Sequence, residues 1–394
     1  MSAKKEPSLF ILMLLVSFAS TFAVLYTPAL PQMAAQLNLT SAQAQLTMTV
    51  FLIGYALGML PYGPLSNRFG RKPPLLVGIL LALISSLLMI VASRWQLFGL
   101  ACLSRFLMAL GSSAGIKMAF TMVGDVYPQE KATKKISLLI LAFAIAPGVG
   151  IALGGLLTER FGWESCFYFL TAYSVLLFLL SLSLPETCAA RDLEPLNVNK
   201  IKTGYLRALK NPILVTTALM MGCGTSVVYL FASEAPFIGM DRLGLTPDTY
   251  GVLNFIPPMG MIIGSLCSRS LAGKKSTTST LSLGSWIALF GSAVMLLLFL
   301  TNWITVWTLF LPMPFIYIGL SFIYSNASAL AMSHAKDKSN ASAIMNFINL
   351  GVSVVAVLSI ESLPIHPASL MPLLFVLFTL LLLLLNKKAK QFIA

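Results

Sequence analysis

The chain has 394 residues, of which 57% are hydrophobic and only 10% are charged. Soluble domains carry about 25% charged residues, so this composition excludes an ordinary soluble protein and indicates one embedded in a bilayer. The formal net charge is +13, and the five cysteines form no CxxC pair and no cluster with histidine. We therefore expect no disulfide framework, no metal site and no cofactor.

Twelve apolar runs are long enough to cross a membrane, which takes about 20 helical residues. They cover residues 8–32, 41–65, 74–92, 96–123, 136–158, 166–184, 212–239, 247–268, 279–300, 303–329, 340–358 and 368–385. The first run lacks a small-residue cleavage site after a short core, so we interpret it as a retained span and not as a signal peptide. The expected fold is an all-α integral membrane protein with twelve transmembrane helices.

A polar connection at residues 185–211 separates six runs from six. We interpret it as a cytoplasmic linker between an N-terminal bundle, residues 1–184, and a C-terminal bundle, residues 212–394. Short motifs recur in the two halves: Leu-Thr at 39–40 returns at 245–246, and Gly-x-Leu-x-x-Arg at 63–68 returns at 264–269. Two pseudo-symmetric halves with a site near the membrane midplane are typical of many secondary transporters.

The lysines and arginines are distributed unevenly between the loops. Twenty-one of the 26 lie in the termini and in the loops after the even-numbered runs, whereas Arg94, Arg160 and Arg242 lie on the opposite side. Basic loops stay in the cytoplasm. The sequence therefore predicts a multi-pass protein of the inner (cytoplasmic) membrane with both termini in the cytoplasm. The same distribution explains the basic charge without a nucleic-acid partner.

The fourth run contains Arg105 and Lys117, the basic residues that fall inside runs of spanning length. A cation in hydrocarbon costs about 3 kcal/mol or more, so it normally faces a water-filled cavity or a partner. Twelve helical residues separate the two cations by about 18 Å along the axis and about 120° around it. We predict that both line a central cavity together with Ser113, which lies in the arc between them. Gly111 and Gly115, on the opposite side, are expected to permit close helix packing.

Each cation has a second interpretation. Arg105 is also explained as a structural residue bonded to carbonyl groups of a neighbouring helix, and Lys117 as a side chain that extends outward along its stem. Other candidates for the pocket are polar and aromatic, and each is equally well explained as a core or interface residue. They are Tyr26, Tyr55, Tyr229, Asn254, Tyr317 and Asn346.

Residues 63–72, between the second and third runs, read GPLSNRFGRK. Glycines at both ends of this turn let two helices approach closely, while the arginines face carboxylates or helix ends. The segment resembles the hallmark loop of the major facilitator superfamily, which normally has Asp where this chain has Asn67. The resemblance implies a gating network of Gly63, Arg68, Gly70, Arg71 and Asp125, in which Arg71 pairs with Asp125. A topology signal alone would also explain the arginines.

Two further motifs resemble the same superfamily. Residues 105–111, RFLMALG, are similar to its fourth-helix arginine signature, whose arginine lines the cavity and takes part in substrate or proton coupling. Residues 146–150, with Pro147 and Gly150, resemble the proline–glycine motif of its antiporters, which suits a helix that must bend. An ordinary tolerated kink is the alternative. Together these motifs place the resemblance nearest the drug/proton antiporter branch and its Bcr/CflA-type efflux proteins.

Members of that branch usually carry an Asp for proton coupling in the first helix, and this chain has Val24 at that position. A proton-coupled transporter needs a carboxylate that titrates inside the membrane. Glu234 is the candidate, although an acid at the membrane interface would explain it as well. With no acid deep in the first half, the cavity is predicted to favour anionic or zwitterionic substrates over lipophilic cations.

The sequence thus predicts a secondary active transporter that works by alternating access as a monomer. We expect it to export a small organic compound, a drug or a metabolite, coupled to protons. An importer or facilitator of a nutrient on the same fold is the runner-up, because fold does not set direction. A membrane receptor or enzyme is the third class, but the sequence contains no nucleophile constellation, paired carboxylates or phosphate-binding loop.

Overall fold

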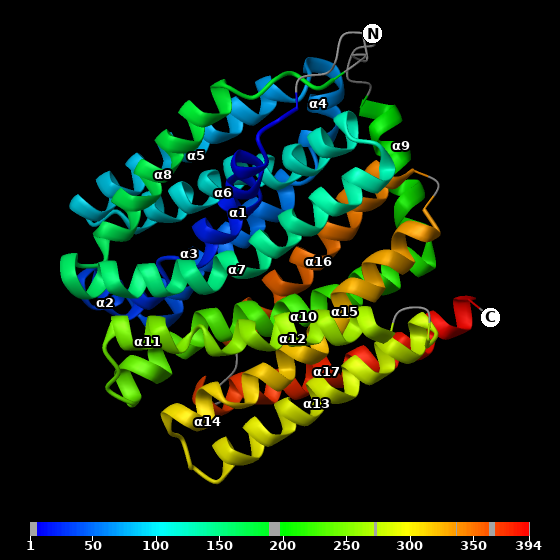
Figure 1. The fold of residues 1–394 in the computed structure, drawn as a ribbon. Helices are drawn as coiled ribbons and strands as arrows, with labels where there is room; N and C mark the ends of the chain where they lie inside the picture. Colours follow the sequence, from blue (N-terminus) through cyan, green and yellow to red (C-terminus); the bar gives the residue numbers. More distant parts are fainter. Residues whose placement is uncertain (1–5, 189–197, 272–273, 336, 362–366, 394) are drawn as a thin grey trace. The chain divides into compact units, whose positions relative to one another are not determined.

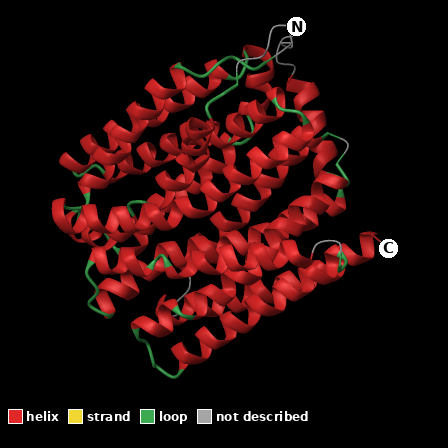
Figure 2. Ribbon diagram, in the orientation of Figure 1, coloured by secondary structure: helices red, strands yellow, loops and turns green. Residues whose placement is uncertain are grey.

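Figure 1 traces the chain in a computed structural model that describes residues 6–188, 198–271, 274–335, 337–361 and 367–393. The regular elements among these residues are helices joined by loops (Figure 2). The chain divides into two compact units, Met1–Lys202 (unit 1) and Thr203–Ala394 (unit 2). The division falls inside the segment 185–211, within the helix α9 (Val198–Leu209).

The remaining helices fall into two consecutive sets. Unit 1 contains α1 (Leu9–Val24), η1 (Thr27–Ala29), α2 (Leu30–Gln36), α3 (Ser41–Gly58), α4 (Tyr62–Phe69), α5 (Lys72–Arg94), α6 (Phe98–Val126), α7 (Gln129–Phe161) and α8 (Glu164–Leu182). Unit 2 contains α10 (Pro212–Phe237), η2 (Ile238–Arg242), α11 (Pro247–Leu253), α12 (Ile256–Leu271), α13 (Thr277–Leu300), α14 (Val306–Phe310), α15 (Pro312–Ser333), α16 (Lys338–Glu361) and α17 (Pro367–Ile393).

These helices confirm the predicted all-α fold. Within the described residues, eleven helices are long and apolar enough to cross a membrane, and α3 with α4, which meet at a bend of 43°, make a twelfth. The second run, expected as one helix over 41–65, instead breaks between Gly58 and Tyr62. Pro61 stands at this break, and because proline has no N–H to donate, the helical hydrogen bonding of α3 does not continue through it.

In unit 1, α6 packs against α5, α3 and α1 (Figure 1). The contact with α5 is made through glycine: a Cβ atom on Gly111 would run into the carbonyl oxygen of Gly78 and lie 2.7 Å from the backbone nitrogen of Ala82. On the α1 side, a Cβ atom on Gly115 would run into the carbonyl oxygen of Leu15. The predicted packing surface of Gly111 and Gly115 is thus confirmed. Such close backbone approach replaces the hydrophobic driving force that helices lack in lipid.

Unit 2 contains the same crossing between α13 and α15. A Cβ atom on Gly319 would run into the carbonyl oxygen of Gly284 and lie 2.6 Å from the backbone nitrogen of Ala288. Gly284 stands 206 residues after Gly78, and Gly319 stands 208 residues after Gly111. Equivalent positions therefore make equivalent contacts, and the two units repeat one structure.

The repeat also corrects the pairing of Gly63 with Gly264 that the sequence motif suggested. Gly264 contacts the carbonyl oxygen of Ile318 and the side chain of Ser321, whereas Gly58 contacts the carbonyl oxygen of Leu110 and the side chain of Ser113. The structural counterpart of Gly264 is therefore Gly58, 206 residues earlier. The motif match was five residues out of register, because small and apolar residues recur along both helices and many alignments look alike.

We predict that Gly111→Ala destabilises the protein, because the added methyl group meets a backbone carbonyl that cannot turn away. The expected cost is about 1–3 kcal/mol, seen as a lower Tm of the purified protein in detergent. Gly124→Ala is the matched control, since it lies on the same helix with no atom within 4 Å of the added carbon. Equal Tm values for the two variants would contradict this account of the α5–α6 contact.

Candidate functional site

The guanidinium of Arg105 is fully buried at the contact between α6 and the end of α1. Its Nη1 atom donates to the carbonyl oxygen of Phe22 at 2.8 Å, and its Nη2 atom donates to that of Ala23 at 3.4 Å. Both carbonyl groups belong to the last turn of α1. The last carbonyl groups of a helix lack partners within the helix and carry the negative end of its dipole. Arg105 therefore caps the C-terminus of α1 with a positive charge.

Two aromatic rings enclose the same guanidinium. The Cζ atom of Arg105 lies 4.1 Å from the ring centroid of Tyr26 and 4.3 Å from that of Phe51. The hydroxyl of Tyr26 is in turn hydrogen-bonded to the Thr47 hydroxyl at 2.8 Å, and Tyr55 lies beside Phe51, with ring centroids 6.3 Å apart. Cation–π contacts are stronger when they are shielded from water. Of the predicted pocket residues, Arg105, Tyr26 and Tyr55 thus come together, and Phe51 joins them.

This arrangement matches the second interpretation of Arg105, a cation bonded to carbonyl groups of a neighbouring helix. The Nε atom nevertheless has no hydrogen-bond partner among the described residues. An unpaired buried donor costs about 1–3 kcal/mol. A role of Arg105 in substrate binding stays a prediction.

Ser113 and Lys117 lie further along α6. The hydroxyl of Ser113 is buried and donates to the carbonyl oxygen of Leu110 in its own helix at 2.8 Å. Ser113 also packs against Gly58 of α3, so this part of the predicted arc forms a helix contact. Lys117 is half-buried, two turns before α6 ends at Val126.

The predicted gating loop is held together at Gly70, which ends α4 with φ of +93°. Residues other than glycine rarely adopt this backbone conformation. A Cβ atom on Gly70 would also meet the carboxylate of Glu186. That carboxylate accepts hydrogen bonds from the backbone N–H groups of Arg71 at 2.9 Å and Lys72 at 3.1 Å. A carboxylate at a helix N-terminus is favourable, so Glu186 caps α5.

Arg71 connects this loop to the end of α6. Its Nε and Nη2 atoms donate to the two carboxylate oxygens of Asp125 at 2.8 and 3.3 Å. Its Nη1 atom donates to the side-chain oxygen of Asn67 at 2.9 Å. The amide at position 67 thus still accepts a hydrogen bond where the family has an acid. Thr187 donates to the same Asp125 carboxylate at 3.0 Å. Arg68 and Gly63 belong to the adjoining helix α4.

The proline–glycine motif lies inside α7, which continues through Pro147. Gly150 has room for a side chain, because the nearest atom to an added Cβ is the Cγ2 atom of Val24 at 3.8 Å. Gly154, one turn later, is the position of close approach: an added Cβ would run into the carbonyl oxygen of Leu25. The contact that fixes α7 against the end of α1 therefore lies at Gly154.

Unit 2 contains a cluster of buried tyrosines. Tyr317 of α15 is buried and has Tyr229, Tyr250 and Tyr324 as electrostatic neighbours. The hydroxyl of Tyr324 is hydrogen-bonded to that of Thr225 at 3.1 Å, which joins α15 to α10. Sequence reasoning placed Tyr229 and Tyr317 in one pocket and missed Tyr250, which is fully buried.

Two of the other polar candidates of unit 2 donate hydrogen bonds to carbonyl oxygens four residues earlier in the chain. The amide of Asn254 donates to the carbonyl oxygen of Tyr250 at 2.8 Å, and that of Asn346 donates to the carbonyl oxygen of Ser342 at 2.9 Å. Glu234 is 1% exposed and lies in the last turn of α10. The π-helical turn η2 begins directly after this helix. The described residues contain no group of three or more side chains able to hold a metal ion.

Residues 9–359 of the chain match the family model described as Major Facilitator Superfamily. The chain belongs to the Major Facilitator Superfamily. It is therefore a multi-pass membrane protein of a family of transporters. The superfamily membership that residues 63–72 and 105–111 suggested is confirmed.

Relatives of this transporter include a multidrug resistance protein, MdtL, of Salmonella typhi. It is 30% identical over 233 residues, which cover 58% of this chain and only 57% of MdtL. An uncharacterized MFS-type transporter, YdgK, of Bacillus subtilis is 28% identical over 330 residues, which cover 83% of this chain and 81% of YdgK. The resemblance to the drug/proton antiporter branch is consistent with these relatives.

Solved structures of other transporters have the same fold. A D-xylose-proton symporter superimposes with a TM-score of 0.74 at 16% identity, covering 95% of this chain and 96% of the symporter. A POT family transporter in complex with 5-aminolevulinic acid superimposes with a TM-score of 0.73 at 14% identity, covering 98% and 95% of the two chains. At these identities the likeness establishes the fold and nothing about the substrate.

The capping role of Glu186 predicts a pH-dependent stability. Burial alone would raise the pKa of this carboxyl, but hydrogen bonds from the N–H groups of Arg71, Cys188 and Lys72 outweigh it, and the pKa lies below its ordinary value of 4.5. A lowered pKa stabilises the fold above the unfolded-state value, and this stabilisation is lost as the pH falls through the folded-state value. As the pH is lowered from about 6 to about 3.5, we expect the Tm of the wild type to fall more steeply than the Tm of Glu186→Gln.

Glu159→Gln serves as the control for this experiment, because Glu159 is exposed on the last turns of α7. Its pH profile should follow that of the wild type. If Glu186→Gln also retained the wild-type slope, Glu186 would not be the group that holds the loop.

Proposed function

We propose that this transporter exports a small organic compound by alternating access and favours anionic or zwitterionic molecules. The supporting observation is Arg105, whose guanidinium is fully buried and bonded to uncharged groups. A buried charge without an opposite charge is costly, and in membrane proteins such residues mark transport pathways. When the contact between α1 and α6 opens, the vacant Nε donor favours an anionic group. The name of the MdtL relative supports the direction of export.

We assign the gate to the network of Gly70, Arg71 and Asp125, because it joins the loop after α4 to the end of α6 through a charge-assisted pair. Such a pair stabilises one of two conformations, and its rupture shifts the equilibrium between them. Pro147 and Gly150 supply the bending helix in this scheme. We also assign the chain to the inner membrane as a monomer with both termini in the cytoplasm and residues 185–211 as the linker, following the basic loops.

An importer or facilitator on the same fold is the second candidate function. The solved symporter and the POT family transporter show that the fold serves more than one kind of transporter. Direction depends on which gradient drives the conformational cycle, and the fold does not fix this. The two functions differ in the membrane side from which substrate is taken up.

Transport by sealed vesicles tests the proposal. We expect inverted vesicles under a proton gradient to accumulate a carboxylate from a panel of organic acids, whereas right-side-out vesicles should not. Arg105→Ala should reduce this uptake about tenfold or more, because it removes charge-assisted hydrogen bonds worth about 1.5–3 kcal/mol each. Arg105→Lys should remain impaired, since an ammonium lacks the planar guanidinium that bonds two carbonyl groups while it lies between two rings.

Arg160→Ala is the control, because Arg160 is exposed at the end of α7. Thermal unfolding of each variant separates loss of transport from loss of fold. Inhibition by cationic dyes alone would overturn the anion preference. Uptake confined to right-side-out vesicles would favour the importer, and unchanged affinity and transport in Arg105→Ala would remove Arg105 from the site.

We further propose that Glu234 carries the coupled proton. This residue is buried in the last turn of α10, and the π-helical turn η2 follows that helix. A carboxyl that changes protonation inside the membrane couples transport to a proton gradient. Glu234→Gln should abolish gradient-driven accumulation while leaving substrate binding within about twofold of the wild type. Asp241→Asn, at an exposed acid of the adjoining turn, should keep both activities. Proton-driven accumulation by Glu234→Gln at the wild-type rate would refute this role.

A further inference from the structure

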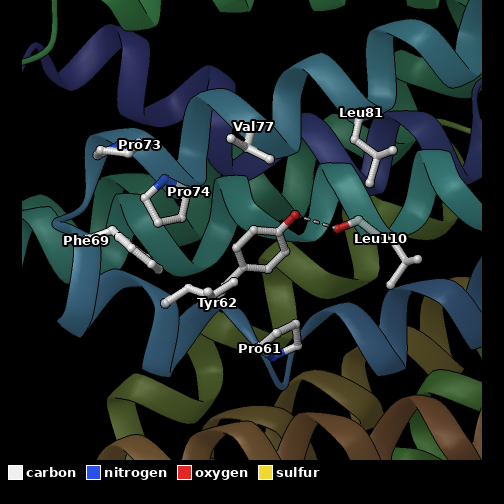
Figure 3. Close-up of a pocket in the computed structure, with 9 residues that line it drawn as sticks. Pro61, Tyr62, Phe69, Pro73, Pro74, Val77, Leu81 and Leu110 are labelled. Carbon is white, nitrogen blue, oxygen red and sulfur yellow. Dashed lines mark hydrogen bonds between the residues drawn. The ribbon is translucent and has the colours of Figure 1, made fainter. Parts of the chain in front are cut away.

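An apolar groove of about 470 Å³ runs between α4, α5 and α6 in unit 1. Figure 3 shows Pro61, Val77, Leu81 and Leu110 around it, with the Tyr62 hydroxyl bonded to the Leu110 carbonyl oxygen at 3.0 Å. The Val77 side chain is 64% exposed on this face. In a chain that spans a bilayer, an exposed apolar face of this kind meets lipid.

Unit 2 carries a groove of about 510 Å³ between α12, α13 and α15. The repeat described above relates its lining to that of the first groove. Pro61, Leu65, Val77, Leu81 and Leu110 line the first groove, and their counterparts Cys267, Leu271, Leu283, Ile287 and Ile318 line the second. Five equivalent positions line both grooves, so the groove is a feature of the repeated architecture rather than a local packing fault.

The grooves differ in the charges near one end. In unit 1 the cations are engaged: Arg71 pairs with Asp125, and the Nζ atom of Lys72 donates to the carbonyl oxygen of Leu182 at 2.6 Å. In unit 2 the corresponding end carries three exposed cations, Arg269, Lys274 and Lys275. None of the three forms an ion pair with a described carboxylate.

Two of these cations lie directly beside the groove. Leu271 lines the groove, and its carbonyl oxygen accepts hydrogen bonds from the backbone N–H groups of Lys274 at 3.0 Å and Lys275 at 3.2 Å. The next residue, Ser276, caps the N-terminus of the 24-residue helix α13. A helix N-terminus adds to the attraction of an anion. The groove of unit 2 is therefore apolar along its length and positively charged at one end.

We propose that the groove of α12, α13 and α15 binds an anionic phospholipid. One acyl chain lies along Leu283, Ile287 and Ile318 and fills the groove, where it gains van der Waals contacts with these side chains. The phosphate lies among Arg269, Lys274 and Lys275, because basic clusters at the end of membrane helices attract anionic headgroups. The equivalent groove of unit 1 offers the same apolar surface, but its cations are already bonded. This site is independent of the transport function proposed above.

Native mass spectrometry of the full chain tests the proposal. The protein is purified with equal amounts of phosphatidylglycerol and phosphatidylcholine, and the lipids that remain bound are counted. We expect one phosphatidylglycerol retained with about tenfold preference over phosphatidylcholine. A triple variant, Arg269→Gln with Lys274→Gln and Lys275→Gln, should lose the preference. Ile287→Trp, which fills the channel, should lose the bound lipid of either kind.

The matched control is Lys387→Gln with Lys388→Gln and Lys390→Gln, which removes the same charge from exposed positions of α17. It should bind lipid as the wild type does. Equal loss in both triple variants would mean general charge attraction and would overturn the site. Retention of phosphatidylglycerol by Ile287→Trp, or its displacement by inorganic phosphate, would mean a surface anion site without a bound chain, and would also overturn the proposal.

A second measurement uses the unaltered chain. Cys267 is exposed in the groove, so a bound acyl chain should shield its thiol from a maleimide. We expect phosphatidylglycerol to slow alkylation of Cys267 about tenfold relative to phosphatidylcholine, as read by peptide mass. Cys102, in helix α6 of unit 1, provides the internal reference. Equal alkylation rates in the two lipids would contradict the proposal even if the variants fail to fold.

Discussion

Backbone contact at glycine is the constraint on which both units depend. Gly111 lets α6 lie directly against Gly78 of α5, and Gly319 lets α15 lie against Gly284 of α13. Between helices in lipid no hydrophobic force drives association, so close packing of this kind must hold the bundle. The grooves lie beside the same crossings, because Val77 and Leu110, which line the first groove, are next in sequence to Gly78 and Gly111.

The polar chemistry of unit 1 follows from where its helices end. α1 ends at Val24, ahead of the proline at position 28, and leaves carbonyl groups that Arg105 satisfies. α5 begins at Lys72 and leaves N–H groups that Glu186 satisfies. A helix end that lies in or near hydrocarbon needs a partner from the protein itself. Both sites named here as functional are thus also helix caps, and a conformational change that breaks them must provide new partners for the freed groups.

Hydropathy predicted the spans well, because each crossing needs a long apolar run whatever its packing. It did not predict the break at Pro61, since an apolar run does not reveal where a helix bends. The cost of burying Arg105 was visible in the sequence, but its partners on α1 and the ring of Phe51 were not. Glu186 lies 115 residues from Arg71, and no local pattern connects them. The register of the repeat needed the contacts of Gly58 and Gly264, because the two motifs disagreed: the Leu-Thr pair gave an offset of 206 residues and the Gly-x-Leu-x-x-Arg pair an offset five residues shorter.

With that register in place, each charge of unit 1 can be compared with its counterpart in unit 2. The offset of 208 residues between α6 and α15 puts Met313 at the place of Arg105 and Ser333 at that of Asp125. The offset of 206 puts Thr277 at the place of Arg71. Met313 is fully buried, so the repeat keeps the packing and loses the charge. A buried cation is therefore not needed to build this fold. Unit 2 also lacks the helix end that Arg105 caps, because α1 ends at Val24 whereas α10 continues to Phe237. The cation in unit 1 alone therefore agrees both with a cap of α1 and with the substrate-binding role proposed for Arg105.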